Sequence, residues 1–112
     1  MNVIQNINKK PESGIGRTVF NSDSMDPTIR CGDVIEVDHT HHEYSGDGIY
    51  CFTWSDGFGN AIILRRVIRQ MDGTYDLVND NDVYPSQKLT DDELAAWPIC
   101  GRVIRSYSAR TH

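Results

Sequence analysis

Cysteine is scarce in this sequence, and the few cysteines are far apart. Cys31, Cys51 and Cys100 are an odd number, and none belongs to a C-x-x-C pair. This spacing indicates neither a zinc site nor a disulfide framework. We therefore expect three small, buried thiols in a reducing compartment, because free cysteine is among the most often buried residue types.

Long apolar runs and an excess of basic charge are also absent. No stretch approaches the roughly 20 apolar residues that a membrane-spanning helix needs. The only basic pair near the start, Lys9 and Lys10, follows the weakly apolar segment, the reverse of a secretory signal. The net charge is -5, from 11 basic and 16 acidic side chains, so a phosphate backbone would be repelled. We expect a cytoplasmic protein that does not bind DNA through this chain alone.

The patterns that are present are those of one small β domain. The 112 residues suffice for a single hydrophobic core. Residues 1–16 have the Asn, Pro, Ser and Gly content of a linker or mobile arm, so we place the domain at residues 17–112. Runs rich in β-branched residues, bounded by Gly and Asp, predict strands at residues 17–20, 33–38, 48–54, 60–69, 74–79 and 99–107.

Helical signals are limited to two short segments. Residues 24–29 are compatible with one turn, and Thr90 with Glu93 has the form of a capping box in a segment that Pro98 ends. The sequence has no helix-turn-helix pattern and no internal repeat. We expect a mostly β fold, a single compact domain of twisted antiparallel strands with one or two short helical turns.

The most informative segment is Ser24-Met25-Asp26-Pro27, which is followed by Gly32-Asp33 and an apolar strand. Four further segments follow at compatible spacing: Gly46–Tyr50, Ile62–Val67, Asn79–Pro85 and Cys100–Ile104. Together they resemble the LexA-like repressor and mutagenesis-protein family, in which a serine precedes a methionine and a later strand reads V-K-R-L. The resemblance covers about residues 17–107 and implies a LexA-like C-terminal domain of the serine-lysine self-cleaving type.

The resemblance also implies that the catalytic lysine is replaced. Aligning Leu64-Arg65-Arg66-Val67 with V-K-R-L puts Arg65 at the position of the base. A buried lysine can lose its proton and then accept one from the serine, whereas arginine stays charged and offers donors only. The chain's three lysines, Lys9, Lys10 and Lys88, do not fall where the family has a catalytic group.

The cleavage site that the family uses is missing as well. Self-cleaving relatives cut an Ala-Gly or Cys-Gly bond upstream of the serine, and the 23 residues before Ser24 contain neither dipeptide. We therefore expect an inactive relative of a serine-lysine autopeptidase, in which Ser24 caps or packs a turn. Ser24 and Arg65 are its vestigial nucleophile and base positions. The residual cleft is expected to include Met25, Asp26 and Leu64.

Histidine is the other residue type that could act as a base or bind a metal. His39, His41 and His42 lie with Asp38 and Glu43 between two predicted strands. Histidines and carboxylates together can bind zinc, but we interpret this segment as a solvated loop. We expect no metal and no other cofactor.

If Ser24 and Arg65 do not catalyse cleavage, the resemblance implies that the remaining function of the domain is binding. Family members associate through this domain, while a separate N-terminal helix-turn-helix domain binds palindromic DNA. We expect a non-cleaving oligomerisation and regulatory domain of a phage-type transcriptional repressor, present as a homodimer or higher oligomer and relieved by a protein antagonist. The expected self-association surface consists of Trp97, Ile99, Arg102, Val103, Ile104, Arg105 and Tyr107.

The sequence is also compatible with other roles for the last strand and for the chain. Ile99, Val103 and Ile104 would equally suit a hydrophobic core. Ser24 would make the chain an active autoprotease if another group served as its base. The chain would otherwise be a stand-alone antagonist or partner of a repressor, and it is either the C-terminal part of a longer protein or a free-standing relative.

Overall fold

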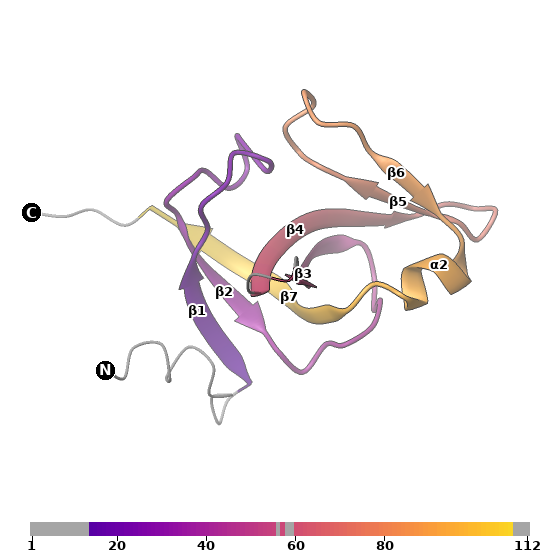
Figure 1. Ribbon diagram of the computed structural model, residues 1–112, viewed down its shortest axis with the longest axis horizontal. Helices are drawn as coiled ribbons and strands as arrows, with labels where there is room; N and C mark the ends of the chain where they lie inside the picture. The colour runs from indigo at the N-terminus through magenta and orange to yellow at the C-terminus, as the bar shows by residue number, and fades with distance from the viewer. Residues whose placement is uncertain (1–13, 56, 58–59, 109–112) are drawn as a thin grey trace, which may run out of the picture.

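The computed structural model describes residues 14–55, 57 and 60–108, and the statements below concern these residues. They form one seven-stranded sheet with a single short helix before the last strand (Figure 1). In chain order the elements are β1 (Ile15–Val19), β2 (Val34–Asp38), β3 (Gly48–Ser55), β4 (Asn60–Arg69), β5 (Tyr75–Val78), β6 (Gln87–Leu89), α2 (Asp91–Ala95) and β7 (Ile99–Tyr107). No helix in the described ranges is long and apolar enough to cross a membrane.

The strands are antiparallel throughout and lie in the order β1-β2-β7-β3-β4-β5-β6. The last strand, β7, is therefore an interior strand of the sheet, between β2 and β3. Its pairing shifts register next to Glu36 and Val37 on β2 and next to Cys51 and Phe52 on β3. Such bulges bend and twist a sheet locally, and the β1-β2 end is strongly rotated from the β5-β6 end (Figure 1).

The hydrophobic core is divided between two clusters of buried side chains. Successive side chains of a strand point to opposite faces, so Cys51 belongs to one cluster and its neighbours Tyr50 and Phe52 belong to the other. The first cluster contains Phe20, Met25, Ile29, Ile35, Val37, Cys51 and Leu64. The second, which α2 and β6 join, contains Tyr50, Phe52, Val67, Tyr75, Leu77, Leu89, Leu94 and Ile99.

The predicted fold class is confirmed, and most predicted strands are present. Those at residues 60–69 and 99–107 have the expected bounds. β1 begins at Ile15, two residues before the expected domain start, so Ile15 and Gly16 belong to the sheet and not to a linker. Residues 1–13 of the expected arm lie outside the described residues. The sequence does not predict β6, because Gln-Lys-Leu is short and contains no β-branched residue.

The helix forms where the capping box predicts it. The Glu93 amide donates to Thr90 Oγ1 at 3.2 Å, and the Thr90 amide donates to Glu93 Oε1 at 2.8 Å. These bonds satisfy two amides that a helix N-terminus otherwise leaves without partners. Leu94 is the buried residue of this helix and fixes it to the second core cluster.

Candidate functional site

Ser24 lies in a turn that the burial of its neighbours holds in place. The Gly32 amide donates to Phe20 O at 2.7 Å, which closes the base of the loop between β1 and β2. Within the loop, the Ile29 amide donates to Met25 O at 3.0 Å, a single helical turn. Met25 and Ile29 are buried in the first core cluster, so the turn cannot rotate without exposing them. Ser24, next to Met25, is itself only 9% exposed.

A second loop, residues 79–85, is bound to the Ser24 turn. The Asn81 amide donates to Ser24 O at 3.0 Å, and Asn81 Nδ2 donates to Asp23 O at 3.0 Å. The Tyr84 hydroxyl donates to Asp23 Oδ1 at 2.6 Å. The N-x-x-Y-P stretch of the sequence therefore holds the backbone on both sides of the Ser24 amide.

Ser24 and Arg65 line the same cleft. The cleft has a volume of about 510 Å³, and its walls are Phe20, Ser22, Ser24, Ile62, Ile63, Arg65, Asn79, Tyr84, Pro85 and Gln87. Arg65 reaches it from β4 and donates from Nη1 to Leu64 O at 2.7 Å. Burial lowers the pKa of Arg65, yet a guanidinium stays protonated in proteins and has no lone pair to accept a proton.

The expected cleft residues beside Ser24 and Arg65 are placed elsewhere, which corrects that prediction. Leu64 is fully buried in the first core cluster, because alternation along β4 points it away from the face of Arg65. Met25 is also fully buried there. Asp26 is exposed on the turn, with Oδ1 4.0 Å from Arg30 Nε.

Asn79 is a cleft residue that was not predicted from the sequence. Val78 pairs with Arg66, so Asn79 and Arg65 are the next residues at the end of the β4–β5 ladder. Asn79 Nδ2 donates to Pro85 O at 3.2 Å, while its buried Oδ1 has no hydrogen-bond partner among the described residues. Asn79 begins the matched segment Asn79–Pro85, two residues before its N-x-x-Y-P stretch, but its place in the cleft depends on the pairing of β4 with β5.

No lysine or histidine lines the cleft among the residues that the structure describes. Lys88 lies on β6 and points to Asp76, with Nζ 3.6 Å from Oδ1. His39 Nδ1 is 2.8 Å from Cys100 O, and His41 Nε2 is 3.4 Å from Asp38 Oδ2. Lys9 and Lys10 lie outside the described residues. Among its described residues, the cleft thus presents the guanidinium donors of Arg65 beside Ser24 and neither a lysine nor a histidine.

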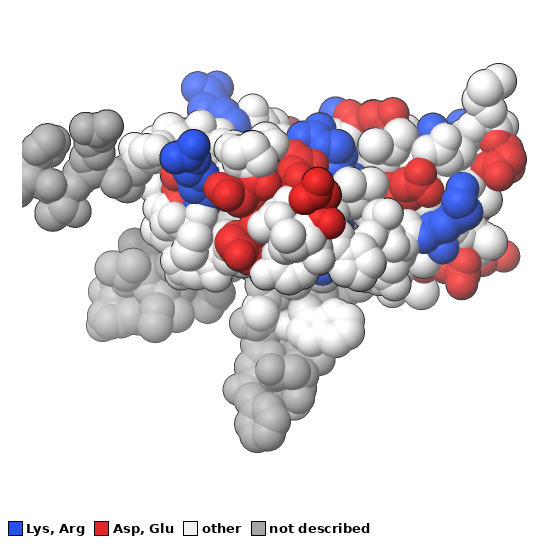
Figure 2. All heavy atoms as spheres, turned by 90° about the horizontal axis from the view of Figure 1, so that it is seen from above, with Lys and Arg blue, Asp and Glu red and all other residues white. Residues whose placement is uncertain are grey.

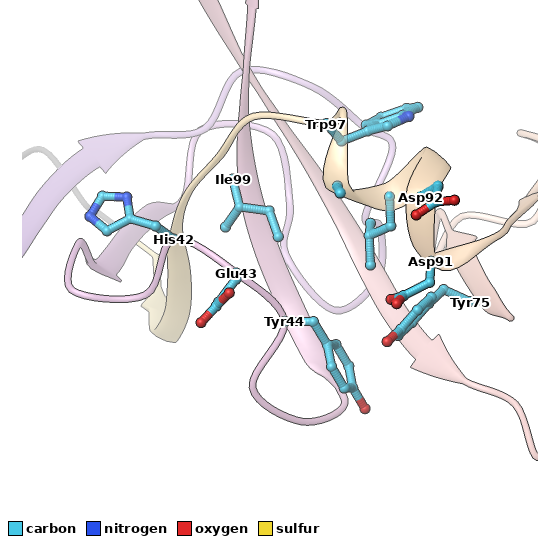
Figure 3. Close-up of a pocket in the computed structure, with 10 residues that line it drawn as sticks. His42, Glu43, Tyr44, Tyr75, Asp91, Asp92, Trp97 and Ile99 are labelled. Carbon is cyan, nitrogen blue, oxygen red and sulfur yellow. The ribbon is translucent and has the colours of Figure 1, made fainter. Parts of the chain in front are cut away.

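A second cavity of about 420 Å³ lies between α2 and the loop before β3 (Figure 3). Glu43 comes from the loop, and Asp91 and Asp92 come from the helix (Figure 3). Tyr44 and Tyr75 meet edge to face, with ring centroids 5.0 Å apart. Within the described ranges, no three His, Cys, Asp or Glu side chains are grouped so that they could hold a metal ion.

The expected association surface divides into inward and outward residues. Ile99 is buried, and Val103 packs against the first core cluster. Trp97 meets Phe52 edge to face at 5.4 Å. Ile99 thus belongs to the core, as the alternative interpretation predicted, while Trp97 and Val103 are partly buried and pack against it.

The remaining residues of that surface point outward or lie over the sheet. Arg102 lies 5.5 Å from the Tyr50 ring centroid and donates to Asp47 O at 2.7 Å. Ile104 and Tyr107 are each 43% exposed. Arg105 Nε is 3.0 Å from Glu36 Oε1 on β2.

Comparison with known proteins gives one family. No curated protein sequence matches the chain. The family model for Peptidase S24-like proteins matches residues 3–104, a range that includes both Ser24 and Arg65. This match confirms the resemblance to LexA-like C-terminal domains that the segments around these two residues indicate. The chain therefore belongs to the Peptidase S24-like family, whose members are serine peptidases and their relatives.

Proposed function

We propose that this chain is a non-cleaving regulatory domain of a phage-type transcriptional repressor, which acts in the cytoplasm by binding proteins. The observation that carries the proposal is the cleft in which Ser24 is accompanied by Arg65 and by no lysine or histidine of the described chain. Serine needs a base to become a nucleophile. A permanently charged guanidinium cannot supply one, so the cleft retains binding groups without a means of hydrolysis.

Self-association would be the first binding function of such a domain. In the sheet, Val34 pairs with Val19 on one side and with Tyr107 on the other, so the three side chains form a row on one face. Val19 is 50% exposed, and Ile104 on the same strand as Tyr107 is also exposed. These apolar side chains support a contact between two copies, which would hold two separate DNA-binding domains together.

The charge distribution supports a protein-binding role for this domain more than direct binding to DNA. Basic side chains on the face in Figure 2 are interspersed with acidic ones and form no continuous basic stripe. Two arginines, Arg17 and Arg105, are paired with the same carboxylate, that of Glu36. Phosphate recognition needs unpaired cations along one surface. DNA contact is therefore assigned to a domain outside this chain. Relief of repression is assigned to a protein antagonist that binds at the cleft.

The test is a cleavage assay on the purified protein. The protein is incubated at alkaline pH, and separately with the activated recombinase filament that triggers self-cleaving relatives, and its mass is followed with time. We expect the chain to remain intact in both. A Ser24→Ala variant is the control, because cleavage that this substitution abolishes would refute the proposal and establish an autoprotease.

A further inference from the structure

We propose that the cleft binds an extended, uncleaved segment of a partner protein that carries an acidic side chain flanked by apolar residues. This site rests on the proposed non-cleaving function, and it specifies which chemical groups the partner carries. The acidic side chain meets Arg65, and a backbone N–H of the segment meets Asn79.

Arg65 is the only arginine among the described residues of the cleft walls, and none of the described carboxylates pairs with it. It forms no ion pair with any residue of the described chain, and the hydrogen bond to Leu64 O uses one of its five N–H donors. The next residue, Arg66, is held in a bidentate pair by Asp80, at 2.8 and 2.7 Å. Arg65 is half-buried, so its guanidinium has lost part of its hydration. A carboxylate of the partner would compensate for this loss and can accept two parallel hydrogen bonds from the guanidinium.

The side-chain amide of Asn79 gives a second, independent indication of a ligand, because its oxygen lacks a hydrogen-bond donor within the described ranges. Its side chain is 7% exposed, and its Oδ1 is buried without a donor among the described residues. A buried acceptor without a partner is costly, and most such groups in folded proteins are paired. Asn79 lines the cleft, and its Nδ2 donates to Pro85 O, so among the described residues Oδ1 is the atom of this amide that lacks a partner. An extended peptide carries the N–H that this oxygen needs.

Apolar hollows adjoin the cleft at two different walls. One, of about 270 Å³, shares Phe20, Ser22 and Ile62 with it and continues to Val19 and Ala61. The other, of about 350 Å³, shares Ile63, Arg65 and Gln87 with the cleft and continues to Trp54 and Trp97. The cleft and the two hollows together would accommodate a peptide segment that extends on both sides of Arg65. The Asp or Glu that meets Arg65 would then lie inside this segment and not at its end.

Exposed apolar side chains gather along this groove. Trp54, Ile62 and Tyr84 are 55%, 40% and 41% exposed, and all three line the cleft or the hollow next to it. Clustered exposed apolar side chains mark interaction sites more often than scattered ones do. By contrast, the cavity lined by Glu43, Asp91 and Asp92 would repel an acidic segment.

The probe is the capped peptide acetyl-Ser-Ser-Val-Leu-Glu-Leu-Thr-Ser-Ser-amide, titrated to millimolar concentration while NMR follows Arg65 Nε and the Asn79 side-chain amide. A second peptide has glutamine in place of the glutamate. A third has that glutamine and a free C-terminal carboxylate. We expect the acidic peptide to shift both signals and to bind on the order of tenfold more tightly than the glutamine peptide, because a charged hydrogen bond is lost.

Arg65→Gln should abolish the difference between the first two peptides. Arg69→Gln, an exposed arginine on the same strand that lines none of the three hollows, should preserve it. The dispersion of each variant's spectrum shows whether it is folded. Equal affinities for the two peptides, or unshifted Arg65 and Asn79 signals, would overturn the site. Tighter binding of the third peptide would overturn the choice of an internal acidic side chain.

Mass spectrometry of the recovered peptides separates this site from the proposed function. Ser24-dependent cleavage would refute the non-cleaving function. Intact peptides that bind without regard to their charge would refute only the acidic-segment site.

Discussion

The Tyr84 hydroxyl donates a hydrogen bond of 2.6 Å to Asp23 Oδ1, and Asp23 directly precedes Ser24. The bond to the carboxylate raises the pKa of Tyr84, because an ionised phenolate would lose the bond and be repelled. With the two bonds from Asn81, this contact joins the loop after β5 to the loop after β1. The geometry of the serine therefore depends on a segment that is distant in sequence.

Tyr84→Phe removes this contact and keeps the ring. We expect faster hydrogen exchange of the Asn81 amide, which donates to Ser24 O, and little change in the centre of the sheet. Hydrogen exchange followed by NMR measures this directly. Val83→Ala is the matched control, since its side chain is exposed on the same loop. Unchanged exchange in Tyr84→Phe would mean that Asn81 alone holds the two loops together.

Replacing Arg65 by lysine should create the missing base. Burial lowers the pKa of Arg65, and the same desolvation would lower the pKa of a lysine, whose neutral amine can accept the serine proton. We expect Arg65→Lys to cleave a supplied peptide with an Ala-Gly bond at least about a hundredfold faster than the unmodified protein, the lower range for general-base catalysis. The rate should rise with pH as the lysine loses its proton.

Two variants control this gain of activity. Ser24→Ala combined with Arg65→Lys should be inactive, because the nucleophile is gone. Arg69→Lys should resemble the unmodified protein, because residue 69 does not line the cleft. An inactive but folded Arg65→Lys would show that more than the base is missing from this site.

The ion pair between Arg66 and Asp80 should make stability depend on pH. The hydrogen bonds from Arg66 hold the pKa of Asp80 below its ordinary value of 3.8. A lowered folded-state pKa stabilises the fold above the unfolded-state value, and this stabilisation is lost as the pH falls through the folded-state pKa. Asp80→Asn should therefore cost about 1 to 2 kcal/mol at neutral pH, allowing for the partial exposure of Arg66.

Urea unfolding over a pH series tests this dependence. The difference between the unmodified protein and Asp80→Asn should shrink below pH 3.8, the ordinary value for Asp80. Asp82→Asn, an exposed carboxylate on the same loop, should show no comparable loss at neutral pH. A constant difference at all pH values would assign the effect of Asp80→Asn to lost packing.

The sequence predicts Ser24 and Arg65 correctly as cleft residues, but it does not predict the other residues of the cleft. Ser24 and Arg65 follow from the order of motifs along the chain, and the structure places them on one cavity. Leu64 is wrongly predicted as a cleft residue although period-two alternation already puts it opposite Arg65. Nearness to Arg65 in sequence therefore does not bring Leu64 to the cleft.

Other features of the site depend on tertiary pairing that no local pattern contains. Asn79 becomes a neighbour of Arg65 only through the register of β4 with β5. β6 is held as a strand by pairing with β5, since its three residues have little intrinsic preference for it. The contacts of Asn81 and Tyr84 with the Ser24 turn likewise require both loops to be in place.

The outward residues of β7 supply the test of self-association. Ile104 and Tyr107 remain exposed, whereas Ile99 is buried in the core and Val103 packs against it. Substitutions at Ile99 or Val103 would confuse folding with association, because they create cavities. Ile104 is therefore the informative position.

We expect sedimentation to show a dimer or larger oligomer of this domain at tens of micromolar. Ile104→Glu should weaken the association by at least about tenfold, since an unpaired carboxylate would be buried in the contact. Met71→Glu is the matched control, because Met71 is fully exposed at the turn after β4. A monomer at these concentrations would contradict self-association through this domain. Equal weakening by both substitutions would point to a charge effect, because the chain already carries a net charge of -5.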